Sequence, residues 1–253
     1  MILAIDAGNS RTKWAVFDES GELQTQGAIS NSELADRTAP DAWQPCKRAV
    51  ISNVAGEEIG HSITSLLQQR NICIKWVKAS AQACGVINSY EFPELLGTDR
   101  WSALIAAWQQ FRAPCLVANA GTALTVDALG IDENGQGIFL GGLIVPGLRL
   151  MQQSLVGAAA GINETGGGIQ FFPTKTENAI HTGALSAMAG AVNSMLVKLE
   201  LHTGQLPHCI VSGGDAVLLQ DMLVHYHVEN IVMAENLVLQ GLLILEKEMG
   251  KGA

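Results

Sequence analysis

The sequence predicts an α/β protein made of two similar halves, each with a mixed β-sheet flanked by helices. Short apolar segments typical of buried strands alternate with longer segments of helical periodicity. Residues 6–12 also resemble residues 119–125, and each segment is followed by a strand and then a hairpin turn. With 48% hydrophobic and 15% charged residues, the composition is that of a compact globular chain. We therefore expect an internal duplication, with halves at residues 1–114 and 115–253.

The first half is predicted to begin with a meander of three strands, at residues 2–5, 12–18 and 23–28, with a Glu19-Ser20-Gly21 turn before the third. A buried strand at 48–53, a helix at 57–70 and a strand at 74–77 follow. Because this last unit has the order strand, helix, strand, the sheet should contain parallel as well as antiparallel pairs.

The second half repeats this order. Strands are predicted at 115–118, 122–129 and 137–143, with a turn at Glu133-Asn134-Gly135. Strong helical periodicity runs from 176 to about 201. The remaining elements are a strand at 208–212, a helix after Asp215, a strand at 231–233 and a final helix at 237–249.

Charge and composition argue against several functional classes. The net charge is −9, and no cluster of lysines and arginines is suited to a run of phosphates, so nucleic acid is not expected as a partner. The chain begins with a strand-like segment in place of a signal peptide, and we expect that it is not exported. We also expect no membrane span, because the longest apolar run considered, at 138–148, is interrupted by glycines and a proline.

The cysteines and histidines show no spacing typical of a metal site. Five scattered cysteines include no Cys-x-x-Cys pair, which favours reduced and mostly buried thiols. Among six histidines, His225 and His227 come nearest to a ligand pair, but surface or core positions are the expected alternative.

The turn after the first strand is a candidate phosphate site. Asp6 ends a buried strand, and Gly8 allows the main chain to approach a ligand so that neighbouring N–H groups can contact phosphate oxygens. Lys13 adds a positive charge, and Asp6 is suited to hold Mg²⁺ directly or through water. An ordinary hairpin with a polar turn is the alternative.

The second half offers a matching turn at Asn119-Ala120-Gly121-Thr122, in which Thr122 supplies a hydroxyl and an N–H. Asp127 adds a carboxylate. We expect the two turns to face one another across a cleft, where nucleotides commonly bind. Residues 212–215 fit either a contact with adenine or ribose or a plain turn from strand to helix. Residues 141–147 fit either a substrate contact or the end of a strand and the start of a helix.

Gly97-Thr98-Asp99-Arg100 precedes an apolar helical run at 101–111. Thr98 or Asp99 is placed to cap that helix. Alternatively, Asp99 accepts a proton from an attacking hydroxyl and Arg100 pairs with a substrate carboxylate or the transferred phosphate. Spacing in the sequence does not separate these two interpretations.

Together these motifs identify a resemblance to the type III pantothenate kinases, the group that includes the Bvg accessory factor-like proteins. The resemblance covers nearly the whole chain and consists of motifs in the same order. They are Asp6-x-Gly8-Asn9-Ser10 with Lys13, Gly97-x-Asp99-Arg100, Ala120-Gly121-Thr122-Ala123 with Thr125 and Asp127, Gly141-Gly142 with Pro146-Gly147, Thr176, and Gly213-Gly214-Asp215.

The resemblance implies the duplicated ribonuclease H-like core of the acetate kinase, sugar kinase, Hsc70 and actin superfamily. It implies ATP-dependent phosphorylation of pantothenate to 4′-phosphopantothenate, the first step of coenzyme A biosynthesis, by a cytoplasmic homodimer. ATP would be bound by Asp6, Ala7, Gly8, Asn9, Ser10, Arg11, Thr12, Lys13 and Thr122. Pantothenate would be bound by Tyr90, Gly97, Thr98, Asp99, Arg100 and Thr176, with Asp99 as the proton acceptor and Thr176 reaching the site from the neighbouring subunit.

One departure concerns the cofactors, which the resemblance gives as Mg²⁺ with ATP and a monovalent cation, K⁺ or NH₄⁺. The family usually has an aspartate where this chain has Asn119. An amide oxygen still coordinates a hard cation, but without the negative charge of a carboxylate, so we expect weak or absent potassium activation. Two alternatives to the pantothenate kinase remain: a kinase for another small hydroxylated metabolite, and an ATP-binding regulator of the same fold without turnover.

Overall fold

The structure is a computed structural model that describes residues 1–158 and 166–250. The chain forms two compact units, Met1–Gln110 with Asn236–Ala253, and Phe111–Glu235. The sequence placed the last helix, at 237–249, in the second half, whereas the structure groups it with the first unit. The division between the halves otherwise falls close to residue 114.

A five-stranded sheet forms the centre of the first unit, in the order β3-β2-β1-β4-β5. Its strands are β1 (Ile2–Ala7), β2 (Arg11–Phe17), β3 (Leu23–Ser30), β4 (Arg48–Asn53) and β5 (Cys73–Trp76). The β1, β2 and β3 pairs are antiparallel, whereas β4 is parallel to β1 and to β5. The predicted meander and the mixed sheet are therefore confirmed.

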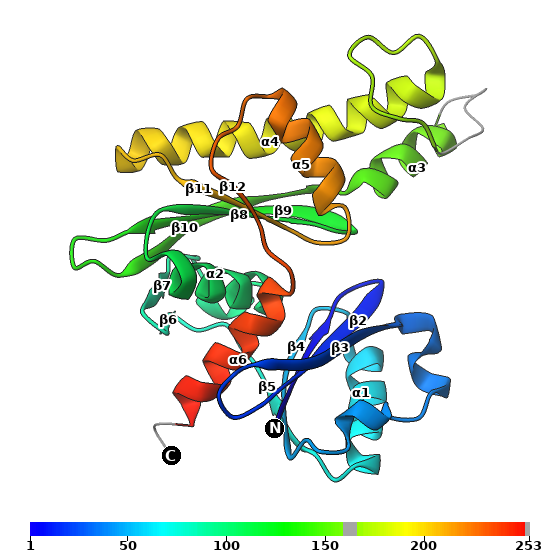
Figure 1. Cartoon of the computed structure of the whole chain (residues 1–253), viewed down its shortest axis with the longest axis vertical. Coiled ribbons are helices and arrows are strands. Elements are labelled where there is room, and N and C mark those ends of the chain that lie inside the picture. Colours follow the sequence, from blue (N-terminus) through cyan, green and yellow to red (C-terminus); the bar gives the residue numbers. More distant parts are fainter. Residues whose placement is uncertain (159–165, 251–253) are drawn as a thin grey trace. The chain divides into compact units, whose positions relative to one another are not determined.

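Helices cover both faces of this sheet (Figure 1). The helix α1 (Glu57–Gln69) packs Ile63, Leu66 and Leu67 against Leu3 and Ile5 of β1. On the opposite face lies α6 (Leu237–Met249), which contacts β1, β2 and β4. With both faces covered, β1 is buried at nearly every position, as expected for a central strand.

The first unit also contains α2 (Thr98–Phe111), whose backbone passes so close to α6 that a Cβ at Gly241 would meet the Ser102 carbonyl oxygen. The shorter elements were not predicted from the sequence. They are the 3₁₀ helices η1 (Asn31–Asp36), η2 (Asp41–Trp43) and η3 (Pro93–Leu95), and the strands β6 (Gln82–Ala83) and β7 (Val86–Asn88).

In the second unit, five strands repeat the order of the first sheet as β10-β9-β8-β11-β12. They are β8 (Cys115–Ala120), β9 (Ala123–Ile131), β10 (Gly137–Pro146), β11 (His208–Ser212) and β12 (Ile231–Met233). Here too the first three strands pair antiparallel, whereas β11 is parallel to β8 and to β12. The predicted duplication is thus present as a repeated strand topology.

Three helices lie along one face of the second sheet: α3 (Leu148–Ala158), α4 (Thr176–Thr203) and α5 (Ala216–His225) (Figure 1). Leu185, Met188 and Val192 of α4 share a core with Leu124 and Val126 of β9. The predicted strands and helices of this half are found within a few residues of their expected ends, and α3 begins where one of the two interpretations of residues 141–147 places the start of a helix.

The expectation that no segment is long and apolar enough to span a membrane was wrong for α4. Among the described residues, this helix of 28 residues meets such a length and composition test. A core helix meets the same test, and about a third of the tested window is buried. The buried side chains are those that pack on the second sheet, so its apolar composition is explained in part by core packing.

All five cysteines are free thiols. Cys46, Cys84, Cys115 and Cys209 are buried and Cys73 is exposed, as the sequence predicted for a mostly buried set. Burial raises the pKa of both Cys115 and Cys209 to about 12, which keeps them protonated and unreactive at neutral pH.

Candidate active site

Asp6 occupies the centre of the candidate site in the first unit. It lies on β1, opposite Lys13 of β2 in the antiparallel pair and opposite Ser52 of β4 in the parallel pair. Its Oδ1 is buried and has no hydrogen-bond partner among the described residues. An unpaired buried carboxylate oxygen is costly, which marks this position as one suited to a proton or a cation.

The surroundings of Asp6 disfavour its negative charge. The pKa of Asp6 is raised to about 7, mainly by burial and also by the nearby Asp99 carboxylate, while the Lys13 ammonium group opposes the increase. A hard divalent cation would relieve the same electrostatic cost. The donor chemistry of Asp6 therefore fits the predicted Mg²⁺ contact.

The turn after β1 is fixed in shape. The Gly8 N–H donates to the Arg11 carbonyl at 3.2 Å, so residues 8–10 form a tight link between β1 and β2. Asn9 and Ser10 are exposed at its tip, as are Arg11 and Lys13 beyond it, whereas the Thr12 side chain is buried. The tip of the turn is therefore accessible to an anion, whereas the Thr12 hydroxyl lies in the protein interior.

A hydrogen bond of 2.8 Å joins the hydroxyls of Ser52 and Thr98. Ser52 is fully buried next to Asp6 in the sheet, and Thr98 is the first residue of α2. The bond therefore ties the start of α2 to β4, the strand beside β1, and Asp99 follows Thr98 directly in the chain. Sequence spacing alone gave no reason to link residues 52 and 98.

Asp99 is not the cap of α2, contrary to one of the two interpretations of its sequence, and neither is Thr98. Both lie within the first turn, and the Trp101 N–H donates to the carbonyl of Gly97. The Asp99 Oδ1 accepts a hydrogen bond of 2.8 Å from the adjacent Arg100 N–H. A Cβ on Gly97 would lie 2.6 Å from this oxygen, so the glycine leaves room for the carboxylate.

Burial raises the pKa of Asp99, while its hydrogen bond with the Arg100 N–H and the Arg100 guanidinium oppose the increase. A carboxylate with a raised pKa is a better proton acceptor once ionised. The Arg100 side chain is buried, and its guanidinium carbon lies 6.0 Å from the centre of the half-exposed Tyr90 ring. The structure thus brings Tyr90, Arg100 and Asp99 into one neighbourhood around the start of α2.

In the second unit, backbone contacts hold the turn between β8 and β9. The Gly147 N–H donates to the Thr122 carbonyl at 3.0 Å, and the Asp215 N–H donates to the Ala120 carbonyl at 3.1 Å. A Cβ on Gly147 would lie 2.1 Å from the Gly121 carbonyl oxygen. Residue 147 therefore packs against the turn, and this segment follows the interpretation that it ends a strand and starts a helix.

Gly213 is required for a similar close approach. Its φ of +104° is strained for other residues, and an added Cβ would lie 2.1 Å from the Ala120 carbonyl oxygen. Asp215 immediately precedes α5. Partial burial raises the pKa of Asp215, and Arg149 opposes the increase. Residues 213–215 thus support the turn directly, in addition to linking β11 to α5.

The strand registers refine the internal alignment of the two halves. Asp6 pairs with Lys13, and Asn119 pairs with Thr125, so Thr125 corresponds to Lys13 and not to Thr12. The reason is that the first turn has one residue more than the second. Asn119 therefore occupies the position that corresponds to Asp6.

Thr176 begins α4 and is exposed. The preceding segment is attached to the helix, because the Gly168 N–H donates to Asn178 Oδ1 at 3.0 Å and the Gln170 N–H donates to Thr182 Oγ1 at 3.1 Å. Phe171 and Phe172 on this segment are 79% and 88% exposed. Two strongly exposed aromatic side chains thus precede Thr176 closely in the sequence.

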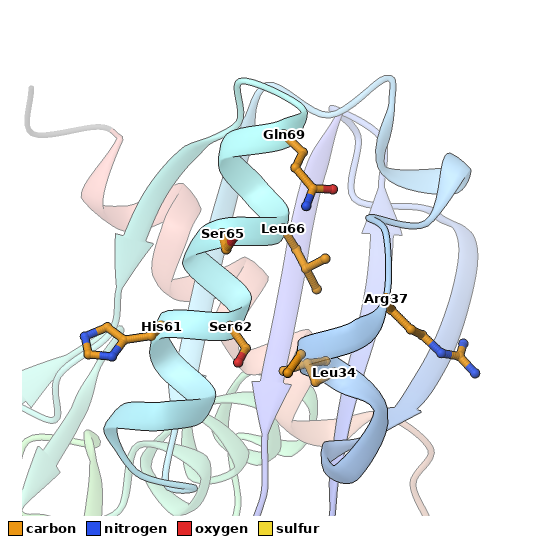
Figure 2. Close-up of a pocket in the computed structure, with 8 residues that line it drawn as sticks. Leu34, Arg37, His61, Ser62, Ser65, Leu66 and Gln69 are labelled. Carbon is orange, nitrogen blue, oxygen red and sulfur yellow. The ribbon is translucent and has the colours of Figure 1, made fainter.

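A groove of about 270 Å³ lies elsewhere on the first unit, between η1 and α1. Figure 2 shows Leu34 and Arg37 on one side and His61, Ser62, Ser65, Leu66 and Gln69 of α1 on the other. None of the predicted site residues lines it. The candidate active site is thus distinct from this groove.

Two contributors to the site were missed from the sequence, Asn31 and Ser52. Each makes hydrogen bonds to residues at least 19 positions away. The only sequence signal is a polar residue at the end of a strand, at positions 30–31 and 52–53, which is too common to identify a role.

The repeated topology defines the fold class of the protein, a duplicated ribonuclease H-like core with mixed sheets flanked by helices. A Campylobacter jejuni protein described as a Baf family transcriptional activator has a TM-score of 0.62 at 20% identity, covering 98% of this chain and 99% of that one. A Sinorhizobium meliloti protein described as a 2-dehydro-3-deoxygalactonokinase has a TM-score of 0.55 at 13% identity, covering 98% and 99%. At such low identity these similarities establish the fold, as predicted.

The chain belongs to the type III pantothenate kinase family, whose sequence pattern matches residues 2–198. It is 45% identical to the type III pantothenate kinase of Methylobacillus flagellatus, over 97% of this chain and 98% of the relative. It is 42% identical to that of Nitrosospira multiformis, over 100% and 94%. The family and the enzyme class expected from the sequence are confirmed.

Proposed function

We propose that this protein transfers the terminal phosphoryl group of ATP to pantothenate, giving 4′-phosphopantothenate for coenzyme A biosynthesis. The observation that carries this proposal is the pair of carboxylates in the first unit. Asp6 has a buried, unpaired oxygen beside the phosphate turn, and Asp99 interacts with it from the start of α2. One carboxylate is thus suited to a cation and the other to a substrate hydroxyl.

ATP is proposed to bind at residues 6–13 and Thr122. Asn9 and Ser10 are exposed residues whose main-chain N–H groups would donate hydrogen bonds to phosphate oxygens, and Arg11 and Lys13 supply positive charge. Asp6 would hold Mg²⁺, which when bound neutralises charge on the phosphate oxygens. Phosphoryl transfer depends mainly on alignment and charge stabilisation, and these residues provide both.

Pantothenate is proposed to bind at Tyr90, residues 97–100 and Thr176. Asp99 accepts the proton of the primary hydroxyl as the new P–O bond forms, and the terminal P–O bond of ATP breaks to release ADP. Arg100 attracts the carboxylate of pantothenate, and the Tyr90 ring packs beside the guanidinium. Burial raises the pKa of Asp99, which makes its ionised form a better proton acceptor.

We propose further that the enzyme is a cytoplasmic homodimer in which Thr176 acts in the neighbouring subunit's site. Phe171 and Phe172 support this, because adjacent aromatic side chains so exposed are typical of protein interfaces. The net charge of −9 supports the absence of a nucleic-acid partner. The core packing of α4 supports a protein that works outside the membrane.

The monovalent cation is proposed to bind weakly if at all. Asn119 corresponds by register to Asp6, and its side chain offers an amide oxygen without a charge. We therefore expect similar rates in sodium and potassium buffers.

The function is tested by measuring ADP release by the purified full chain with Mg-ATP and a potassium or ammonium salt, with and without pantothenate. ADP release that depends on pantothenate, with phosphopantothenate identified by mass, supports the proposal. Binding of ATP without turnover would favour a regulator. Turnover only with another hydroxylated metabolite would favour a different kinase.

A further inference from the structure

We infer that Asn31 is a positioning residue for the ATP-binding turn, an inference that rests on the proposed function of that turn. Asn31 makes three hydrogen bonds to it. Its Nδ2 donates to the Gly8 carbonyl at 2.7 Å, its Oδ1 accepts from the Thr12 hydroxyl at 3.0 Å, and its main-chain N–H donates to the Ser10 carbonyl at 3.2 Å. Asn31 thus contacts the turn at Gly8 and Ser10 and the start of β2 at Thr12.

The asparagine amide suits these partners in a way that few side chains do. The Gly8 carbonyl can only accept a hydrogen bond, and the Thr12 hydroxyl donates here, so the residue between them must donate and accept at once. Thr12 is fully buried, and its hydroxyl would lose this partner if Asn31 were shortened. Aspartate would keep an acceptor for Thr12 and lose the donor to Gly8.

Asn31 is held in place from both sides along the chain. Before it, Ser30 pairs with Arg11 at the end of β3, which aligns Asn31 with the turn. After it, Leu34 of η1 is buried in the same core as Ile63 and Leu66 of α1. Figure 2 shows Leu34 beside Leu66 in the groove between η1 and α1. The side chain that contacts the turn is therefore presented by an anchored segment.

In the second unit, the main-chain N–H groups of Gly147 and Asp215 donate hydrogen bonds to the corresponding turn, and Gly147 and Gly213 approach it closely. The first turn, which has one residue more, is instead held by the side chain of a residue 19 positions beyond Thr12. A longer turn has more conformations to restrict, and the hydrogen bonds of Asn31 would restrict them.

The test compares Asn31→Asp and Asn31→Ala with Ser32→Ala, a control on the next, exposed residue of η1. Dissociation constants for a non-hydrolysable ATP analogue, KM for ATP and for pantothenate, kcat and the melting temperature are measured on the full chain. We expect the dissociation constant and KM for ATP to rise on the order of five- to tenfold in Asn31→Asp, and at least as much in Asn31→Ala. KM for pantothenate should change less than about twofold, and Ser32→Ala should match the wild type.

Two results would overturn the inference: unchanged ATP affinity in Asn31→Asp, or equal weakening of ATP and pantothenate binding together with a lower melting temperature. Should Asn31→Ala fail to fold, the comparison of Asn31→Asp with Ser32→Ala still decides the matter. Failure of the proposed function is seen separately, as a wild-type protein without pantothenate-dependent ADP release.

Discussion

The hydroxyl of Ser52 lies 2.8 Å from the hydroxyl of Thr98, and this contact links the central sheet of the first unit to the first turn of α2. Because Ser52 is the register partner of Asp6 and Thr98 precedes Asp99, the bond relates the two carboxylates on which the proposed chemistry depends. Neither hydroxyl is at the tip of the phosphate turn. We expect them to hold the start of α2 in place, where the Asp99 carboxylate raises the pKa of Asp6.

Loss of this hydrogen bond should lower turnover more than ATP affinity. We expect Ser52→Ala to reduce stability by about 1 kcal/mol and kcat on the order of tenfold, because the start of α2 is released from the sheet. Thr98→Val removes the same bond, so the double variant should be less impaired than the sum of the single changes. Ser62→Ala, on α1, is the control and should retain wild-type kcat. Strict additivity of the two changes would contradict a shared role.

Removal of the proposed base should abolish most turnover without preventing ATP binding. Asp99→Asn keeps the size of the side chain and is expected to lower kcat by about 10²- to 10⁴-fold. Glu94→Gln, an exposed change on η3, should be neutral. Steady-state kinetics together with binding of an ATP analogue separate the two effects. A fully active Asp99→Asn protein would leave only a structural role for this residue.

As the pH is lowered, activity should begin to fall at a higher pH than it would if the base were an aspartate with an ordinary pKa. The base is active when ionised, and burial raises the pKa of Asp99 above its usual 3.8, so kcat/KM should decrease as the pH falls toward that raised value. The measurement is kcat/KM for pantothenate from pH 4 to 9 at saturating ATP, limited to conditions in which the protein stays folded. A plateau extending unchanged to the ordinary range of aspartate would contradict the assignment.

Asp6 should make the free protein less stable as the pH rises from about 4 to about 7. Its pKa is about 7 when folded and near 3.8 when unfolded, so the folded state binds more protons in this window and stability falls with increasing pH. Asp6→Asn removes this loss and should stabilise the magnesium-free protein at pH 8 by about 1–3 kcal/mol. Denaturant unfolding of both proteins at pH 4.5 and 8 gives the difference. An equal stability difference at both pH values would argue against a raised pKa.

The two adjacent glycines at 213 and 214 should respond very differently to substitution. Gly213→Ala forces a Cβ toward the Ala120 carbonyl at a positive φ and should destabilise the protein by about 2 kcal/mol or more. A Cβ on Gly214 meets nothing within 4 Å, so Gly214→Ala is the matched control. Thermal unfolding of both variants tests the packing, and similar melting temperatures would show that the close approach can relax.

A carboxylate at position 119 should introduce potassium dependence. We expect Asn119→Asp to be more active in potassium than in sodium buffer by several-fold, while the wild type differs little, because the added charge strengthens cation binding. Rates at equal ionic strength with Na⁺, K⁺ and NH₄⁺ provide the comparison. Strong potassium activation of the wild type would show that the amide oxygen of Asn119 suffices.

Local sequence patterns predicted most of the regular structure. The strands β4, β11 and β12 and the helix α6 have the bounds expected from apolar runs, turns and helical periodicity. Short elements such as β6, β7 and η1 were missed because two to six residues carry too little periodic signal. The length of α4 was predicted correctly. Its apolar character was overlooked because its large apolar residues are interspersed with small and polar ones.

The sequence by itself determined the family, the duplicated topology and the identity of Asp6, Asp99 and Arg100 as candidates, because these depend on motifs read in order along the chain. Only the tertiary structure decided which distant residues support them. Asn31 and Ser52 act through contacts across strands, and the register of β1 and β2 against β8 and β9 showed which positions in the halves correspond. Such contacts depend on strand pairing over long separations, a relationship that no local spacing in the sequence encodes.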